Sequence, residues 1–284
     1  MVKPSLTITR QSATILRMEY QLAQELGSVL KQARNELAQA LKANPGNYGL
    51  LQYQKVIESH VEILDQRLKQ SGSFDQTLET GRKFGHDLTG EAGAIPRDSR
   101  FWEPLPTLPL EAIAIERSKF ADLIQNLTEA HRTLTLREVK LSLALGEGTQ
   151  ELMDRLLGTG LSGLQGRDGV FRTARTRAET IARTVTNDLI NRGALSGYQE
   201  LDQYFPELEM QKLWVTTSDK RTSNRCKSLV GQVRDLNDNF LAYDGWTGQN
   251  PPSHPNCRSR LVSVTKRYKA EWEDKWKTSR PKSN

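Results

Sequence analysis

The chain has 284 residues, of which 36% are apolar and 26% are charged, and its formal net charge is +6. This apolar fraction is too high for a disordered chain but low for one compact core, so an elongated helical part with a smaller globular part is expected. No stretch approaches the roughly 20 consecutive apolar residues that span a bilayer, and the start lacks the apolar core of a signal peptide. Synthesis in the cytoplasm is expected, and the mild basic excess favours an anionic partner such as nucleic acid.

Two amphipathic helices are predicted at the start, over 12–43 and about 48–70. Between them, "NPGN" (44–47) supplies helix breakers. Because this connection is short, the helices are expected to form an antiparallel hairpin in which each apolar stripe buries the other. Apolar residues recur every three or four positions in both, and in the first helix they are Leu22, Leu26, Val29, Ala33, Leu37 and Leu41.

The region 72–110 reads as looser, because "IPRDSRFWEPLPTLPL" (95–110) holds four prolines in sixteen residues. It predicts an extended connector anchored by Phe101 and Trp102. A long helix is expected over 111–145, and His131 falls within its apolar phase, which favours a hydrogen-bonded core or boundary histidine over a ligand. His60 and His86 receive the same structural interpretation. The apolar positions of the long helix are Phe120, Leu123, Leu127 and Leu134.

A composition shift follows, because "GTGLSGLQGRDG" (158–169) contains five glycines in twelve residues. We therefore predict a helical assembly region over 1–157, a Gly-rich hinge over 158–170, and a C-terminal module with a basic tail over 171–284. The β-branched stretches 213–218 and 261–268 are typical of strands. The predicted fold class is α+β, with a predominantly helical N-terminal region followed by a small α+β module.

The only two cysteines lie in this module, and together with a histidine and an aspartate they form a candidate metal site. Thiolate and imidazole suit zinc, which prefers four tetrahedral ligands. Two alternatives stay open. In the first, a proline-stiffened turn buries the cysteines as small apolar groups. In the second, the thiol acts as a nucleophile, or the chain is a metal-dependent enzyme acting on nucleic acid. The candidate ligands are Cys226, His254, Cys257 and Asp219.

Arginines on the helix that follows the glycines are a second candidate site. Guanidinium groups pair with phosphates bidentately, which predicts nucleic-acid binding. The alternative is a solvated helix face whose arginines bridge Asp168, Glu179 and Asp188. The candidate nucleic-acid contacts are Arg172, Arg175, Arg177 and Arg183.

Four blocks in a fixed order, "RAETIARTVTNDLINRGA", "WVTTSDKRT", "CKSLVGQV" and "PPSHPNCR", resemble the Mu F-like head morphogenesis family of tailed phages. The resemblance covers about 172–265. It places Cys226 where relatives carry Cys or His, as a metal ligand would permit. The family pattern falls on Trp214, Asp219, Arg221, Thr222, Gly231, Pro251, Pro252, His254, Pro255, Asn256, Cys257 and Arg258.

Two departures from the family pattern affect the site. Members commonly read C-R-C at the end of the last block, whereas here Ser259 replaces the second cysteine, which removes one zinc ligand. Members also commonly read A-R-T-E in the helix block, whereas here Val185 follows Thr184, which removes a carboxylate.

The resemblance implies a non-enzymatic minor head protein of a tailed phage or prophage, located inside the capsid near the portal, and in the host cytoplasm during assembly. Implied partners are the portal and the major capsid or scaffold protein, with double-stranded DNA as a further partner. Zinc is the expected cofactor if there is one. Alternatives are a metal-dependent enzyme acting on nucleic acid and delivered with the genome, and a DNA-binding module.

Overall fold

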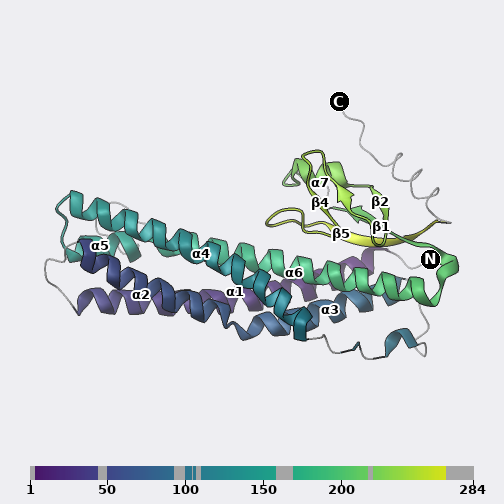
Figure 1. The fold of residues 1–284 in the computed structure, drawn as a ribbon, viewed down its shortest axis with the longest axis horizontal. Coiled ribbons are helices and arrows are strands. Elements are labelled where there is room, and N and C mark those ends of the chain that lie inside the picture. The colour runs from purple at the N-terminus through teal and green to yellow at the C-terminus, as the bar shows by residue number, and fades with distance from the viewer. Residues whose placement is uncertain are drawn as a thin grey trace. The chain divides into compact units, whose positions relative to one another are not determined.

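A computed structural model describes residues 4–43, 50–92, 100–103, 105–106, 110–157, 169–216 and 220–266. Long helices form most of this structure and short antiparallel strands gather near its C-terminal end (Figure 1), which confirms the α+β class. The elements, in chain order, are α1 (Pro4–Lys42), α2 (Leu50–Lys69), α3 (Gly72–Ala92), η1 (Arg100–Trp102), α4 (Leu110–Ala144), α5 (Thr149–Leu157), α6 (Gly169–Tyr204), η2 (Pro206–Leu208), β1 (Met210–Val215), α7 (Asn224–Leu229), β2 (Val233–Asp235), β3 (Phe240–Leu241), β4 (Thr247–Gly248) and β5 (Arg260–Thr265).

Contacts divide the chain into two compact units. The helical unit comprises Glu19–Asp75 and Leu108–Ala182, and the mixed unit comprises Met1–Met18, Gln76–Thr107 and Arg183–Asn284. The boundaries fall inside α1, α3 and α6, so each of these helices contributes residues to both units. The hinge predicted over 158–170 stays a prediction, because 158–168 lie outside the described residues.

In the helical unit, the predicted amphipathic helices are confirmed. Figure 1 shows α2 running alongside α4, and these two helices pack against each other along much of their length. An ion pair between Arg67 of α2 and Glu36 of α1 (Nη1–Oε2 2.7 Å) links the first two helices. The predicted breaker at 44–47 lies outside the described residues. The buried stripe of α1 in this unit is Leu22, Leu26, Leu30, Ala33, Leu37 and Leu41, so Leu30 takes the place predicted for Val29.

Two histidines and a phenylalanine pack together inside the helical unit. His131 of α4 lies 4.7 Å from Phe171 of α6 and 5.8 Å from His60 of α2, measured between ring centroids. Burial lowers the pKa of both histidines to about 4. His131 is thus a core residue as predicted. The expected hydrogen bond is not formed with normal geometry among the described residues, although the Val170 backbone lies close enough to raise the pKa of His131 slightly.

The prediction of a looser chain over 72–110 was wrong for 72–92, which forms α3. Its four glycines weaken helix propensity, although Ser71 stands at the position where an N-cap residue is favoured. Tertiary contacts supply the helix stabilisation that the local sequence does not provide. The Glu25 carboxylate of α1 accepts hydrogen bonds from the backbone N–H groups of Gly72 (2.9 Å) and Ser73 (2.8 Å), which otherwise have no partner at a helix start.

In the mixed unit, glycines bring α3 and α6 into backbone contact. A Cβ atom at Gly85 would lie 2.3 Å from the Ile190 carbonyl oxygen, and one at Gly193 would lie 2.4 Å from the Arg82 carbonyl oxygen. These glycines therefore serve close packing rather than a turn.

The predicted anchoring role of Phe101 is confirmed within the mixed unit. Its buried ring stacks on His86 of α3, with centroids 4.1 Å apart. His86 Nε2 in turn lies 2.8 Å from a Glu200 carboxylate oxygen of α6. The proline-rich connector that surrounds Phe101 is described only in part.

The larger sheet of the mixed unit has the strand order β2-β1-β5, and both pairings are antiparallel; β3 and β4 form a second, two-stranded antiparallel sheet. The strands predicted from 213 and 261 are confirmed, although β1 begins three residues earlier, at Met210. Trp214 is fully buried near the end of β1, paired with Leu261 of β5, and its ring contacts Phe240 and Trp246 at centroid distances of 5.1 and 5.7 Å. This aromatic cluster packs β1 into the same hydrophobic core that contains both cysteines.

Among the described helices, none combines the length and apolar character needed to cross a bilayer.

Candidate metal centre

The two cysteines and His254 come from two segments that flank the small sheet of the mixed unit. Cys226 lies in the first turn of α7, a helix whose start is capped by Ser223, because the Ser223 hydroxyl accepts a hydrogen bond from the Cys226 backbone N–H at 3.2 Å. His254 and Cys257 lie in the loop between β4 and β5. The Cys257 N–H donates to the His254 carbonyl oxygen (3.2 Å), which bends this loop so that both side chains face α7.

The three side chains form one compact cluster. Cys226 Sγ is 3.0 Å from His254 Nε2 and 3.6 Å from Cys257 Sγ, and all three ligand atoms lie within 4.8 Å of one another. Both cysteines are free thiols and buried, whereas His254 is half-buried. The predicted grouping of Cys226, His254 and Cys257 is thus reproduced in three dimensions. Asp219, the fourth predicted ligand, lies outside the described residues.

The ring of His254 is held at both nitrogens. Nδ1 lies 2.7 Å from the Pro255 carbonyl oxygen, which can only accept, so Nδ1 carries the proton. Nε2 therefore presents its lone pair to the cysteines and to the Ser223 hydroxyl, 2.8 Å away. A backbone carbonyl that fixes the tautomer in this way is the usual support of a metal-binding histidine.

Hydroxyl groups surround the sulfur atoms. A hydrogen bond from the Cys257 thiol lowers the pKa of Cys226, burial opposes that shift, and the Ser223 and Ser253 hydroxyls reinforce it. Because Cys257 supplies the shared proton, its own pKa is raised. The environment therefore favours a thiolate at Cys226, which is the form that binds metal.

Ser259 stands immediately before β5 and is fully buried. Its hydroxyl lowers the pKa of both thiols, and it makes no hydrogen bond of normal geometry among the described residues. A buried hydroxyl without a partner is costly, so its position beside the thiols calls for an explanation.

Polar residues of α6 attach this loop to the helix, and sequence reasoning missed them. Asn187 Nδ2 donates to the Cys257 carbonyl oxygen at 2.7 Å, and the Thr184 hydroxyl accepts from the Asn256 N–H at 3.2 Å. One turn later, Asn191 Oδ1 accepts from the Leu261 N–H at 2.8 Å, which continues the attachment onto β5. The available signal was polar residues at 184, 187 and 191, spaced three and four apart within an otherwise apolar helix face.

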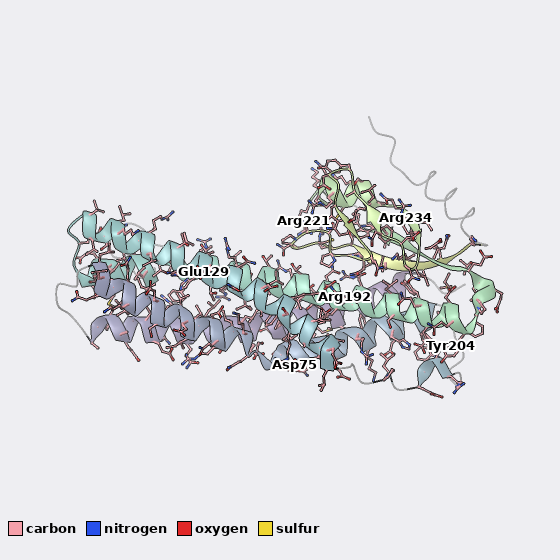
Figure 2. All side chains as sticks on the ribbon, in the orientation of Figure 1. Asp75, Glu129, Arg192, Tyr204, Arg221 and Arg234 are labelled. Atoms are coloured by element: carbon pink, nitrogen blue, oxygen red, sulfur yellow. The ribbon has the colours of Figure 1, made fainter. Side chains whose placement is uncertain are left out.

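The other motif residues build the frame of the site rather than its ligand set. Gly231 adopts a positive φ of 81°, and its N–H donates to the Trp214 carbonyl oxygen at 2.9 Å, so this position favours glycine. Pro251 and Pro252 are joined by a cis peptide bond ahead of His254. Arg221 is exposed, as Figure 2 shows with Arg234 on the same sheet-bearing part, and Thr222, Pro255 and Arg258 are partly or fully exposed.

The four candidate nucleic-acid arginines are all exposed on α6. Arg175 forms an ion pair with Glu179 (3.6 Å), and Arg177 donates to the Asn126 carbonyl oxygen at 3.4 Å. Arg183, in the mixed unit, reaches the Asn256 carboxamide oxygen at 3.5 Å. These contacts are long and solvated, so they leave the guanidinium groups accessible to water.

Two kinds of chemistry fit the cluster. A Cys226–His254 pair, oriented by the Pro255 carbonyl, has the spacing of a thiol nucleophile and its base. However, Cys226 is only 2% exposed, which leaves the thiol no surface through which a substrate could reach it. Metal binding needs no such access. The burial of both thiols therefore favours a metal ligand set over a nucleophile.

A separate polar cavity of about 490 Å³ lies between α6 and the 248–252 loop within the mixed unit. Arg192, labelled in Figure 2, lines it together with Asp188, but the two side chains pair with each other at 2.8 Å. Asn250 also donates to Asp188 (3.0 Å). The charged groups that line the cavity thus neutralise one another.

Comparison with known proteins identifies a family match around this site. Residues 135–262 match the family model described as phage Mu protein F like protein, which confirms the resemblance predicted from the sequence blocks. The minor head protein GP7 of Bacillus phage SPP1 is 23% identical over 221 residues, which cover 75% of this chain and 63% of that protein. The chain thus spans less than two thirds of this relative. No solved structure matches significantly.

Proposed function

From the Mu F-like match over residues 135–262, we propose that this chain is a minor head protein that assists the assembly of a tailed-phage or prophage head. The observation that carries this proposal is the overlap of that match with the complete Cys–His–Cys module and the α6 residues that attach its loop. A cluster whose two thiols are buried and whose loop is attached to α6 is suited to a structural role. Similarity to a minor head protein over three quarters of the chain supports the same role.

The long helices are the proposed docking elements for the portal, scaffold or major capsid protein. They present several large apolar side chains to solvent, and Leu51 and Ile115 of the helical unit are 74% and 56% exposed. Exposed apolar residues on charged helices fit assembly contacts that form and separate as a head matures. If the portal is the docking partner, the chain lies inside the capsid near the portal.

Assembly is tested by co-expressing the full chain with the portal, scaffold and major capsid proteins encoded by its own phage, and by separating particles on a gradient. We expect the chain to sediment with procapsids in a few copies. Omitting the portal should remove it from the particles if docking is portal-dependent, whereas retention would assign docking to the shell or scaffold. A chain that stays at the top of the gradient in all combinations would contradict the proposal.

Contact with packaged double-stranded DNA is the finer part of the proposal, and the exposed arginines of α6 support it. Replacing Arg172, Arg175 and Arg177 by Gln should weaken DNA binding and reduce the salt dependence of log K by about 0.9 for each phosphate that is no longer neutralised. A matched control replaces three exposed basic residues of α4, Lys119, Arg132 and Arg137, by Gln. Equal losses in both triple variants would show only a general charge effect.

The same preparation tests the enzymatic alternative. Because the thiols are buried, we expect no cleavage of DNA by the purified protein with or without added divalent metal. Hydrolysis that disappears in His254→Ala but persists in the α4 triple variant would overturn the structural role.

A further inference from the structure

The Cys–His–Cys cluster has the spacing of a tetrahedral zinc site. With Zn–S bonds of about 2.3 Å, two thiolates on one tetrahedral ion lie roughly 3.8 Å apart. The two Sγ atoms are 3.6 Å apart, which is near that value and well beyond the roughly 2.0 Å of a disulfide. The 3.0 Å from Cys226 Sγ to His254 Nε2 requires only a small retreat of the imidazole to admit the ion.

Three ligands leave one tetrahedral corner open, and one buried group stands beside it. Ser259, two residues after Cys257 and immediately before β5, is fully buried, and its hydroxyl has no hydrogen-bond partner of normal geometry in the described part of the chain. Ser253, also buried, instead has its hydroxyl engaged with Cys226 Sγ at 3.4 Å. Of these two buried serine hydroxyls, that of Ser259 is the one without a hydrogen-bond partner.

We propose that Cys226, His254 and Cys257 bind one zinc ion and that the Ser259 hydroxyl occupies the fourth position. The protonated Nδ1 of His254 leaves Nε2 free to bind, and the attachment of Cys257 to Asn187 holds the loop in place before the metal arrives. Because the fourth corner is closed by a buried side chain, the ion is structural and joins α7 to the segment that enters β5. This inference does not depend on the proposed role in head assembly.

Metal content is the first test. The full-length protein is purified under reducing conditions with zinc supplied, dialysed, and analysed for bound metal and free thiols. We expect one zinc per chain in the wild type, and loss of the ion in Cys226→Ser and His254→Ala. A wild-type protein without metal, or one whose two cysteines form a disulfide under these conditions, would overturn the proposal.

Variants at Ser259 test the fourth ligand without removing the other three, so they are expected to fold. Ser259→Cys should bind zinc at least tenfold more tightly in competition with a chromogenic chelator, because a thiolate is a softer ligand. Ser259→Ala should weaken binding by about tenfold. Equal affinities in wild type, Ser259→Ala and Ser259→Cys would remove Ser259 from the ligand set.

Cobalt substitution reads the ligand set directly. The wild type should show the visible bands of tetrahedral Co²⁺, and Ser259→Cys should raise the sulfur-to-cobalt charge-transfer absorbance about 1.5-fold, as two thiolates become three. Ser228→Cys is the matched control, because Ser228 is half-buried on the same helix as Cys226 but bonds the Arg225 carbonyl. A comparable rise in Ser228→Cys would contradict the assignment.

Discussion

The core of the helical unit and the metal-centre loop of the mixed unit use histidine in opposite ways. In the helical unit, His60 and His131 are packed against Phe171, and burial keeps their rings neutral. In the mixed unit, His254 is half-buried, and its two nitrogens face a carbonyl oxygen and a thiol. The contrast shows that burial alone makes a histidine a packing element, whereas a fixed tautomer beside soft ligands makes it suitable for metal.

The largest effect is expected when the metal is removed, which should destabilise the mixed unit and leave the helical unit unchanged. With free zinc at about 1,000 times its dissociation constant, the ion should stabilise this unit by about 4 kcal/mol. Chelation should remove that stabilisation in the wild type and change nothing in Cys226→Ser, as measured by denaturant unfolding. If chelation also destabilised the helical unit, zinc dependence would not be confined to the mixed unit and the comparison would fail.

A fall in pH should destabilise the helical unit. The pKa of His60 and His131 is about 4 when folded and near 6.5 when unfolded, so below pH 6.5 the unfolded chain binds protons first. Stabilisation by the neutral rings is therefore complete above about pH 6.5 and is lost as the pH falls towards 4. At pH 5 the loss should be about 2 kcal/mol for each histidine.

Unfolding at pH 7 and pH 5 measures this effect, with His60→Leu and His131→Leu beside the wild type. Each variant should reduce the stability difference between the two pH values by about half. Variants that keep the full wild-type difference would assign acid sensitivity to other groups.

Helix packing in the mixed unit depends on glycine, and a single methyl group tests it. Gly193→Ala should destabilise by about 1–3 kcal/mol, because its Cβ would meet the Arg82 backbone. Gly27→Ala is the control, since no atom lies within 4 Å of its added Cβ, and it should stabilise α1 by about 0.5–1 kcal/mol. Thermal unfolding of both variants measures the difference. Equal shifts would show that α3 and α6 are not held at backbone contact.

The smallest effect is expected at the Arg67–Glu36 pair between α1 and α2. Both side chains are more than a third exposed, so water screens the pair. Arg67→Ala should cost less than about 1 kcal/mol in denaturant unfolding. A larger loss would show that ion pairs contribute more to the stability of the helical unit than its buried apolar stripes lead us to expect.

The sequence alone determined the features that local periodicity and residue order carry. The stripes of α1 and α2 follow a helical repeat, the β-branched runs predict β1 and β5, and the order of the four motif blocks identified the Mu F-like resemblance. Cys226, His254 and Cys257 could be grouped because they are the soft-ligand residues of that region. Each of these signals is encoded within a short window or in residue type.

Only the tertiary structure decided the rest. Helix α3 was missed because its glycines oppose helix formation locally, while contacts with Glu25 and with α6 supply the stabilisation. Asn187 and Asn191 were missed because their partners are backbone groups of the β4–β5 loop and of β5, about 70 positions away. Ser259 reads in sequence as a lost cysteine, yet in the fold its hydroxyl is buried without a hydrogen-bond partner among the described residues, which makes it the proposed fourth ligand. Side chains distant in the chain meet there because helix and strand packing, rather than local sequence, sets their separation.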